Sequence, residues 1–70
     1  MENIIKKLRK DARLRQEDLA NELGVTRQTI IAIENDKYDP TLELAIKISN
    51  FFKKTVNEIF LYEEQKEERE

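Results

Sequence analysis

The stretch that decides the fold is RQEDLANELGVTRQTIIAIEN, residues 15–35. Counted from Gln16, an alanine stands fifth, a glycine ninth, and isoleucines fifteenth and eighteenth. The small Ala20 lets a second helix approach the first, and Gly24 can adopt the positive φ of a tight turn. The isoleucines would bury the inner side of the second helix. These steric demands are met together, so the spacing predicts a helix-turn-helix.

The second helix of this pair begins without an acid. Thr26 is a typical N-cap residue, and Arg27–Thr29 fill the first turn, although the positive end of a helix favours Asp or Glu there. If this turn enters the major groove of DNA, carboxylates would face phosphates and base acceptors. Arg can instead donate two bonds to guanine, and Gln can pair with adenine. The pattern therefore predicts a recognition helix over residues 26–35.

Composition indicates one all-α domain, because 70 residues contain a single glycine and a single proline. The chain has no cysteine and no histidine, which removes thiolate metal sites and the commonest catalytic base. We therefore expect no enzyme, metal, cofactor or small-molecule ligand. No apolar run approaches the ~20 residues of a membrane span, and no signal peptide is evident. We expect a cytoplasmic protein.

The net charge of −2 by itself argues against a nucleic-acid binder. The charge is unevenly distributed along the chain, however. Residues 1–37 carry eight Lys/Arg and seven Asp/Glu, whereas residues 38–70 carry five and eight. Because binding depends on which face the cations occupy, the total does not exclude DNA.

One helix is predicted before the pair, from a cap at Asn3 to about Arg13. Ile5, Leu8 and Ala12 recur at i, i+3, i+7 spacing and are expected to form its buried face. The next helix, 16–23, is expected to bury the following residues: Leu19, Ala20 and Leu23.

Two helices are predicted after the pair, beyond a loop over residues 36–40. Thr41 caps the first of them, whose inner face is expected to consist of Leu42, Ala45, Ile48 and Phe52. The sequence TVNE, Thr55–Glu58, matches a capping box and opens a short fifth helix that ends about Leu61. Residues 63–70 are a charge run expected to be a disordered tail, so the domain spans residues 1–62.

Apolar residues crowd the end of the predicted domain, more than its core can hold. Phe52 and Ile59 are the simplest core residues. The surplus consists of Phe51, Leu61 and Tyr62. We expect this surplus to form a homodimer interface, or to be covered by a short C-terminal strand at residues 61–63. A monomer with a few exposed aromatics is the remaining alternative.

The segment RQEDLANELGVTRQTIIAIENDKYDPTLELAIKISNFFKKTVNEIF resembles the Cro/C1-type repressors, also called the XRE family. The resemblance covers about residues 4–61. It implies a five-helix, lambda-repressor-like domain that binds double-stranded operator DNA as a homodimer. We expect a sequence-specific transcriptional regulator, a repressor, that places residues 26–35 in the major groove of a palindromic operator. A protein-interaction module of the same fold, antitoxin-like or an adaptor, is the alternative.

The resemblance also implies roles for individual residues. The expected base contacts are Thr26, Arg27, Gln28 and Ala32. The DNA backbone contacts that the resemblance implies are Gln16, Asn35 and Lys37, and we also expect Arg15, beside Gln16, and Thr29 to contact the backbone. Gln16 would also brace the recognition helix. Arg9 would pair with Glu34, and a partly exposed pair would contribute little.

Four positions depart from the family pattern. Arg15 stands at an N-cap that is commonly Ser or Thr, and the missing cap should cost about 1 kcal/mol. It could add a phosphate contact, or be a neutral exposed substitution. Arg13 and Lys53 stand where glycine is frequent, so both turns are expected to be strained or built differently. Lys54 replaces a usually apolar residue, which puts the packing before the fifth helix in doubt.

Overall fold

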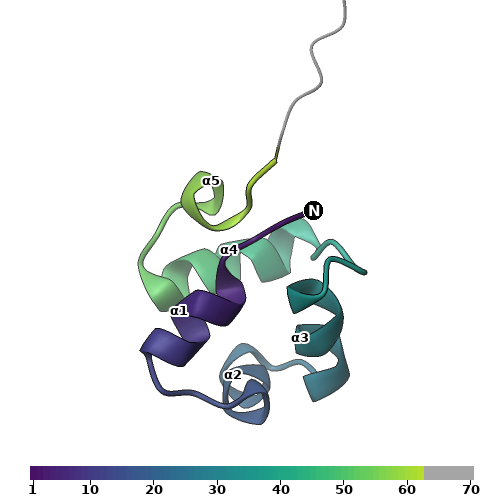
Figure 1. Cartoon of the computed structure of the whole chain (residues 1–70), viewed down its shortest axis with the longest axis vertical. Helices are drawn as coiled ribbons and strands as arrows, with labels where there is room; N and C mark the ends of the chain where they lie inside the picture. Colours follow the sequence, from purple (N-terminus) through teal and green to yellow (C-terminus); the bar gives the residue numbers. More distant parts are fainter. Residues whose placement is uncertain (63–70) are drawn as a thin grey trace, which may run out of the picture.

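The computed structural model describes residues 1–62 as five α-helices around one core. The helices are α1 (Ile5–Asp11), α2 (Gln16–Leu23), α3 (Arg27–Glu34), α4 (Leu42–Phe52) and α5 (Val56–Ile59). Figure 1 shows α2 and α3 at one end, α5 and the N-terminal segment at the other, and α1 and α4 between them. The predicted all-α, five-helix fold is confirmed. The predicted tail, 63–70, lies outside the described residues. No helix within residues 1–62 has the length and apolar character that crossing a membrane requires.

The α2–α3 unit has the predicted geometry. Gly24 follows α2 in the left-handed region, with φ +73°. The N–H of Val25 returns to the Ala20 carbonyl at 3.0 Å, which closes the turn. Thr26 then caps α3, its Oγ1 accepting from the Thr29 N–H at 3.2 Å. The turn and the cap are both set by residues close together in the sequence.

All five helices contribute to a single apolar core. Its buried members are Ile5, Leu19, Ala20, Leu23, Ile30, Ile33, Leu44, Ala45, Ile48, Ile59 and Phe60. Phe51, Phe52 and Val56 are half-buried against it. The core therefore fixes α3 by its inner side alone and leaves the outer side of that helix free.

In the predicted first helix, Ile5 and Leu8 pack in the core as expected, but Ala12 and both predicted ends are wrong. Ala12 is exposed because α1 ends at Asp11 and Ala12 is only its C-cap. Arg9 is buried instead, one turn after Ile5 on the same side of the helix. Asn3 lies one residue outside the N-cap position, although its Oδ1 still accepts from the Ile5 N–H at 3.1 Å. Its Nδ2 donates to the Ile33 carbonyl at 2.9 Å and so ties the N-terminal segment to α3.

The predicted inner face of α4 is wrong at one position. Leu42 is 76% exposed, whereas Leu44, Ala45 and Ile48 are buried. At 3.6 residues per turn, Leu42 lies about 200° around the helix from Leu44, on the opposite side. The i, i+3 spacing from Leu42 to Ala45 suggested one stripe, but the packed stripe begins two residues later.

The predicted C-terminal strand at residues 61–63 is replaced, within the described residues, by an isolated antiparallel bridge between Asn3 and Phe60. α5 ends at Ile59, not Leu61, because Phe60 takes up an extended backbone. Around the bridge, the Ile4 N–H donates to the Ile59 carbonyl at 3.0 Å, and the Leu61 N–H to the Glu2 carbonyl at 2.8 Å. The N-terminal segment thus secures α5.

Three turns contain a non-glycine residue with positive φ: Arg13 (61°), Asp36 (61°) and Lys53 (57°). The strain predicted at Arg13 and Lys53 is therefore present, since left-handed backbone is unfavourable for residues with a Cβ. The packing before α5 is achieved without an apolar residue at position 54. Lys54 is exposed there, and its N–H donates to the Ser49 carbonyl at 3.1 Å.

Candidate nucleic-acid interface

The first turn of α3 is polar and points away from the core. Thr26, Arg27 and Gln28 are exposed, and the described α3 carries no acid in this turn. Thr29 is half-buried, and its hydroxyl lies 3.0 Å from that of Thr26. Ala32 is half-buried one turn after Gln28, on the same side of the helix. Three of the four expected base-contact residues therefore stand at the start of α3, and Ala32 follows one turn later on the side of Gln28.

The expected backbone contacts lie at both ends of this surface. Arg15 and Gln16 stand at the start of α2, and Asn35 and Lys37 follow the end of α3. Asn35 and Lys37 are both exposed, and the Lys37 backbone is fixed by its N–H, which donates to the Ala32 carbonyl at 2.8 Å. The fold thus brings residues from two helices and one loop to the same region.

Arg15 takes the N-cap position of α2 without capping it, because an arginine side chain has no acceptor atom. Asp18 supplies the other half of a capping box, accepting from the Arg15 N–H at 2.9 Å. Arg15 also donates its Nε and Nη2 to the Asp18 carboxylate, at 3.2 and 3.3 Å. This side-chain bond, followed by the backbone bond, holds the pKa of Asp18 below its ordinary value. The Arg15 side chain is still 81% exposed.

A buried polar cluster joins α1, α2 and α3. Arg9 donates Nε to Glu34 Oε2 at 2.7 Å and Nη2 to Glu34 Oε1 at 3.1 Å, with side chains only 8% and 1% exposed. Arg9 Nη1 also donates to the Leu14 carbonyl at 2.9 Å. The predicted pair is confirmed, but it is buried rather than partly exposed. Loss of either partner would leave an uncompensated charge in the core.

Gln16 is the third member of this cluster. Its Nε2 donates to Glu34 Oε1 at 3.2 Å, which confirms the predicted brace on α3. An ionised carboxylate only accepts, so Glu34 fixes which end of the Gln16 amide faces inward. The second N–H of that amide has no protein partner within the described residues and is free to donate outward. Sequence reasoning missed this role of Glu34.

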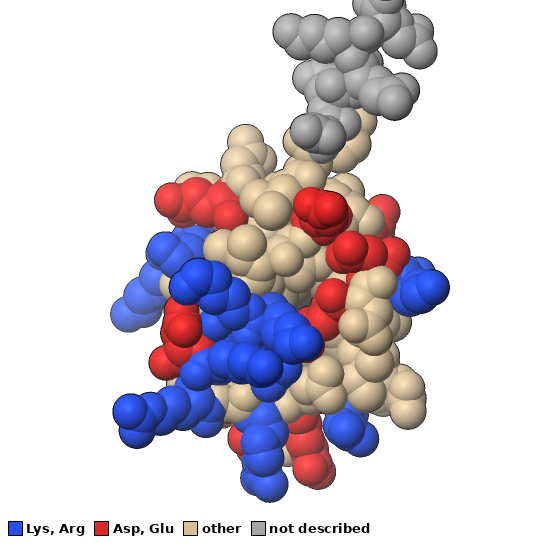
Figure 2. Space-filling view, in the orientation of Figure 1, with Lys and Arg blue, Asp and Glu red and all other residues tan. Residues whose placement is uncertain are grey.

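Cations surround the start of α2 and α3. One shallow depression there is lined by Lys6, Arg9, Lys10, Arg15, Gln16, Glu17 and Arg27. Figure 2 shows Lys and Arg side chains gathered on the half of the molecule that holds α1 and α2, with several Asp and Glu side chains toward the end that holds α5. A net negative chain thus presents a cationic face beside α3.

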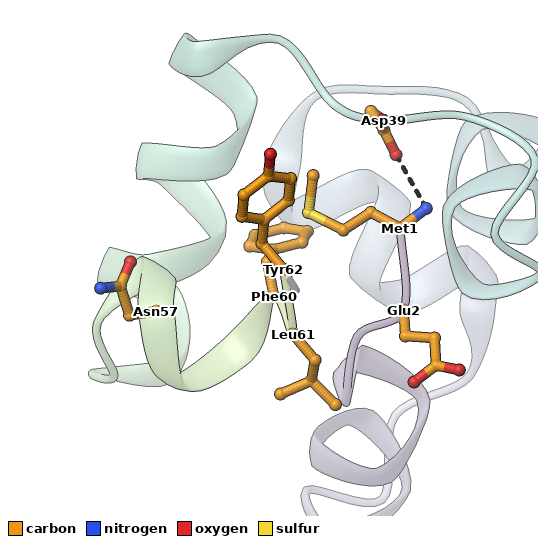
Figure 3. Close-up of a pocket in the computed structure, with 7 residues that line it drawn as sticks. All are labelled: Met1, Glu2, Asp39, Asn57, Phe60, Leu61 and Tyr62. Atoms are coloured by element: carbon orange, nitrogen blue, oxygen red, sulfur yellow. Dashed lines mark hydrogen bonds and ion pairs between the residues drawn. The ribbon is translucent and has the colours of Figure 1, made fainter. Parts of the chain in front are cut away.

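The end of the molecule that holds α5 is hollowed and partly apolar. This hollow is lined by Met1, Glu2, Asp39, Asn57, Phe60, Leu61 and Tyr62. Figure 3 shows the Met1 side chain turned toward the Phe60 and Tyr62 rings, while Leu61 points the other way. The Met1 amine donates to Asp39 Oδ1 at 3.2 Å. Of the predicted surplus, Leu61 and Tyr62 are exposed, whereas Phe51 packs against the core, edge-on to Phe52 at 5.0 Å.

Comparison with known proteins places this geometry in a family. A helix-turn-helix family model matches residues 5–59, from the start of α1 to the end of α5. An uncharacterized HTH-type transcriptional regulator of Methanocaldococcus jannaschii is 56% identical over 64 residues, 91% of this chain and 97% of the relative. One from Archaeoglobus fulgidus is 40% identical over 65 residues (93% and 92%), and YgzD of Bacillus subtilis 43% over 65 residues (93% and 98%). The chain belongs to the XRE family of helix-turn-helix transcriptional regulators.

Proposed function

We propose that the protein is a repressor that binds a palindromic operator as a homodimer, with α3 in the major groove. The observation that carries this proposal is the exposed first turn of α3, where Arg27 and Gln28 stand and no acid does. A helix that carries donors where its own dipole favours carboxylates is suited to an anionic ligand.

Base readout falls to the exposed side of α3. Arg27 can donate two bonds to guanine O6 and N7, and Gln28 can bond adenine N6 and N7. The Thr26 methyl and Ala32 are suited to apolar contact with a thymine methyl. Because the cap and the core fix the backbone of α3, these four side chains would present one preformed pattern.

Phosphate contacts would set the register of that helix on the duplex. Gln16 offers the free N–H of an amide that Glu34 orients, and the exposed Arg15 guanidinium lies next to it. Thr29, Asn35 and Lys37 would hold the backbone at the start and after the end of α3. These contacts give affinity for any sequence and make binding fall with salt.

We place the homodimer interface at Leu61 and Tyr62, beside the hollow in Figure 3. Both side chains are exposed apolar groups that follow a backbone bridge to the N-terminal segment. Phe51 is half-buried against the core, so the proposal leaves it out of the interface. A two-fold dimer would present two α3 helices and so require a palindromic site.

A protein-interaction module is the second candidate, and α4 carries the observation that favours it. Leu42 and Ile46 are exposed and lie one turn apart on the same side of this helix. Such a stripe is typical of a surface that binds another protein.

Selection of duplexes from a random pool by the purified protein tests the proposal. We expect a recovered palindrome, and binding that weakens steeply with salt. The double variant Arg27→Ala/Gln28→Ala, which should keep its helical spectrum, is the matched control and should recover duplexes that share no common sequence. Recovery of no sequence, together with no binding at low salt, would support the protein-interaction module. A reporter with the palindrome placed across its promoter then tests repression.

A further inference from the structure

Two lysines of α1 have no role in the interface described so far. Lys6 and Lys10 are exposed and stand one turn apart, so their side chains leave the same side of the helix. Neither forms an ion pair with another residue of the described range, 1–62. Lys7, between them, pairs with Asp11 at 3.0 Å and is thereby partly neutralised. Lys6 and Lys10 therefore carry charge that the fold itself does not use.

Both lysines line the depression that begins at the starts of α2 and α3. Five of its seven residues are cations, and Glu17 is its acid. Arg9 is neutralised by Glu34 and Arg15 shares its charge with Asp18. The charge that remains comes from Lys6, Lys10 and Arg27, so the depression is cationic along its length.

We propose that Lys6 and Lys10 form a second phosphate-binding surface, the α1 shoulder, which holds the duplex backbone outside the major groove. The inference rests on the proposed DNA binding. Arg27 opens α3 and would stand at the groove, and Gln16 would meet the phosphates that border it. Since Lys6 and Lys10 line the same depression as these two residues, a backbone that passes Gln16 continues over α1.

The chemistry of the α1 shoulder suits phosphate rather than bases. Lysine is a compact charge on a flexible stem, so it can follow a backbone without fixed geometry. Such contacts release counterions, carry no sequence information and depend strongly on salt. The α1 shoulder would therefore add affinity and length of footprint, and leave the choice of sequence to α3.

The test compares two double variants with the same change in charge. Lys6→Gln/Lys10→Gln removes the α1 shoulder. Lys53→Gln/Lys54→Gln removes two exposed lysines at the turn between α4 and α5, which line a different hollow, with Ser49, Asn50, Thr55 and Glu58. Affinity is measured across a salt series on the selected palindrome and on a short duplex of arbitrary sequence. Thermal unfolding verifies that both variants fold.

Removal of the α1 shoulder should weaken binding on both duplexes by the same factor. The log–log salt slope should fall by about 0.9 per lysine, or about 1.8 per bound chain. A rise from about 50 to about 200 mM salt would then weaken this variant about 12-fold less than the wild type for each bound chain. Lys53→Gln/Lys54→Gln should leave the slope unchanged.

Two results would overturn the inference while the proposed function stands. One is a Lys6→Gln/Lys10→Gln slope equal to that of the control variant in a protein whose wild type binds DNA. The other is a loss confined to the palindrome, since that would make the lysines readers of sequence. Failure of the wild type to bind either duplex would overturn the proposed function and this inference together.

Discussion

The α2–α3 unit and the end formed by α4 and α5 are held in place by different interactions. The first depends on a left-handed glycine, a threonine cap and a buried polar cluster in which Glu34 accepts from Arg9 and Gln16. The second depends on apolar packing, the Thr55–Glu58 capping box and two backbone bonds to the N-terminal segment. Directional bonds thus fix the helix that would read DNA, and less directional contacts fix the other end.

The two regions also differ in what they expose. The exposed first turn of α3 is polar, whereas Leu42, Leu61 and Tyr62 are exposed apolar residues around α4 and α5. Fixed polar groups suit recognition of a base edge, because hydrogen bonds to bases need exact placement. Exposed apolar groups suit contact with a second protein surface. One small domain thus separates a surface suited to DNA from a surface suited to protein.

The largest expected effect comes from breaking the polar cluster. Glu34→Ala leaves Arg9 as an unpaired buried charge and should lower the free energy of unfolding by about 3–5 kcal/mol. The double variant Arg9→Met/Glu34→Leu replaces the ion pair by apolar groups of similar size and should recover most of the loss. Urea unfolding measures both. If Glu34→Ala is no less stable than the double variant, the pair is not the buried constraint that its geometry indicates.

Substitutions at the end of the molecule that holds α5 should change the association of the chains rather than their folding. Leu61→Asp or Tyr62→Asp should give monomers with an unchanged helical spectrum, and affinity for the palindrome should fall by about 100-fold or more, since the two half-sites are no longer linked. Leu42→Asp is the matched control and should stay dimeric. Light scattering decides the state of association. Monomers from Leu42→Asp alone would move the interface to α4.

Arg27 tests whether α3 reads bases or only phosphates. Arg27→Ala should lose about 1–3 kcal/mol of binding on the cognate site and much less on a site already changed at the contacted guanine. Folding should barely change, because the side chain is exposed. A double-mutant cycle between residue 27 and that base pair measures the coupling. Coupling near zero, with a salt slope reduced by about one, would assign Arg27 to phosphate.

The same two regions explain what could be predicted from the sequence. The α2–α3 unit was predictable to the residue because its demands are local: a small residue at Ala20, positive φ at Gly24, and a cap at Thr26. The ends of α2 and the N-caps of α3, α4 and α5 likewise depend on residues close together in the sequence. The expected DNA contacts were assigned mainly from the resemblance to the Cro/C1-type repressors, and their contact with DNA stays a prediction.

The errors lie where distant segments decide the outcome. Leu42 has an apolar side chain at helical spacing, but packing against other helices selects a different face of α4, and Ala12 falls at the C-cap where α1 has already ended. Arg9 is buried only because Glu34, 25 residues later, lies opposite it. The bridge between Asn3 and Phe60 joins the two ends of the described chain. The resemblance indicated the pair of Arg9 with Glu34 but not its burial, and no local sequence pattern indicates the bridge or the packed face of α4.

Relief of a strained turn should stabilise the α4–α5 end by a smaller amount. Lys53 has φ +57°, which costs about 1–2 kcal/mol for a residue with a Cβ. Lys53→Gly should raise the free energy of unfolding by about 0.5–1 kcal/mol after the added freedom of the unfolded chain is counted. Asp36→Gly should gain less, because aspartate tolerates this conformation better. A loss of stability in Lys53→Gly would show that its side chain packs usefully.

The smallest expected effect is the loss of stability at low pH. The two regions differ in what lowers the pKa of their capping carboxylates. The pKa of Asp18 is lowered first by the Arg15 side chain and then by the Arg15 N–H, whereas that of Glu58 is lowered first by the Thr55 N–H and then by the Thr55 hydroxyl. A carboxylate whose pKa is lower in the folded state stabilises the fold above its unfolded pKa. That stabilisation is lost as pH falls through the folded pKa, so both caps should weaken below their ordinary values of 3.8 and 4.5.

Thermal unfolding between neutral pH and pH 3 should therefore show a decline that Asp18→Asn and Glu58→Gln each flatten in part. Arg15→Ala discriminates between the regions, because it removes the largest cause of the Asp18 shift and leaves Glu58 untouched. Arg15→Ala should reduce the pH-dependent loss of stability by the part that comes from the Arg15 side-chain bond. The reduction should be smaller than in Asp18→Asn, because the Arg15 N–H still lowers the pKa of Asp18. Added salt should also reduce the part of the decline that comes from Asp18, because the main partner of Asp18 is a cation. It should hardly change the part that comes from Glu58. An equal response of both carboxylates to Arg15→Ala would contradict this separation and point to the net charge of the chain instead.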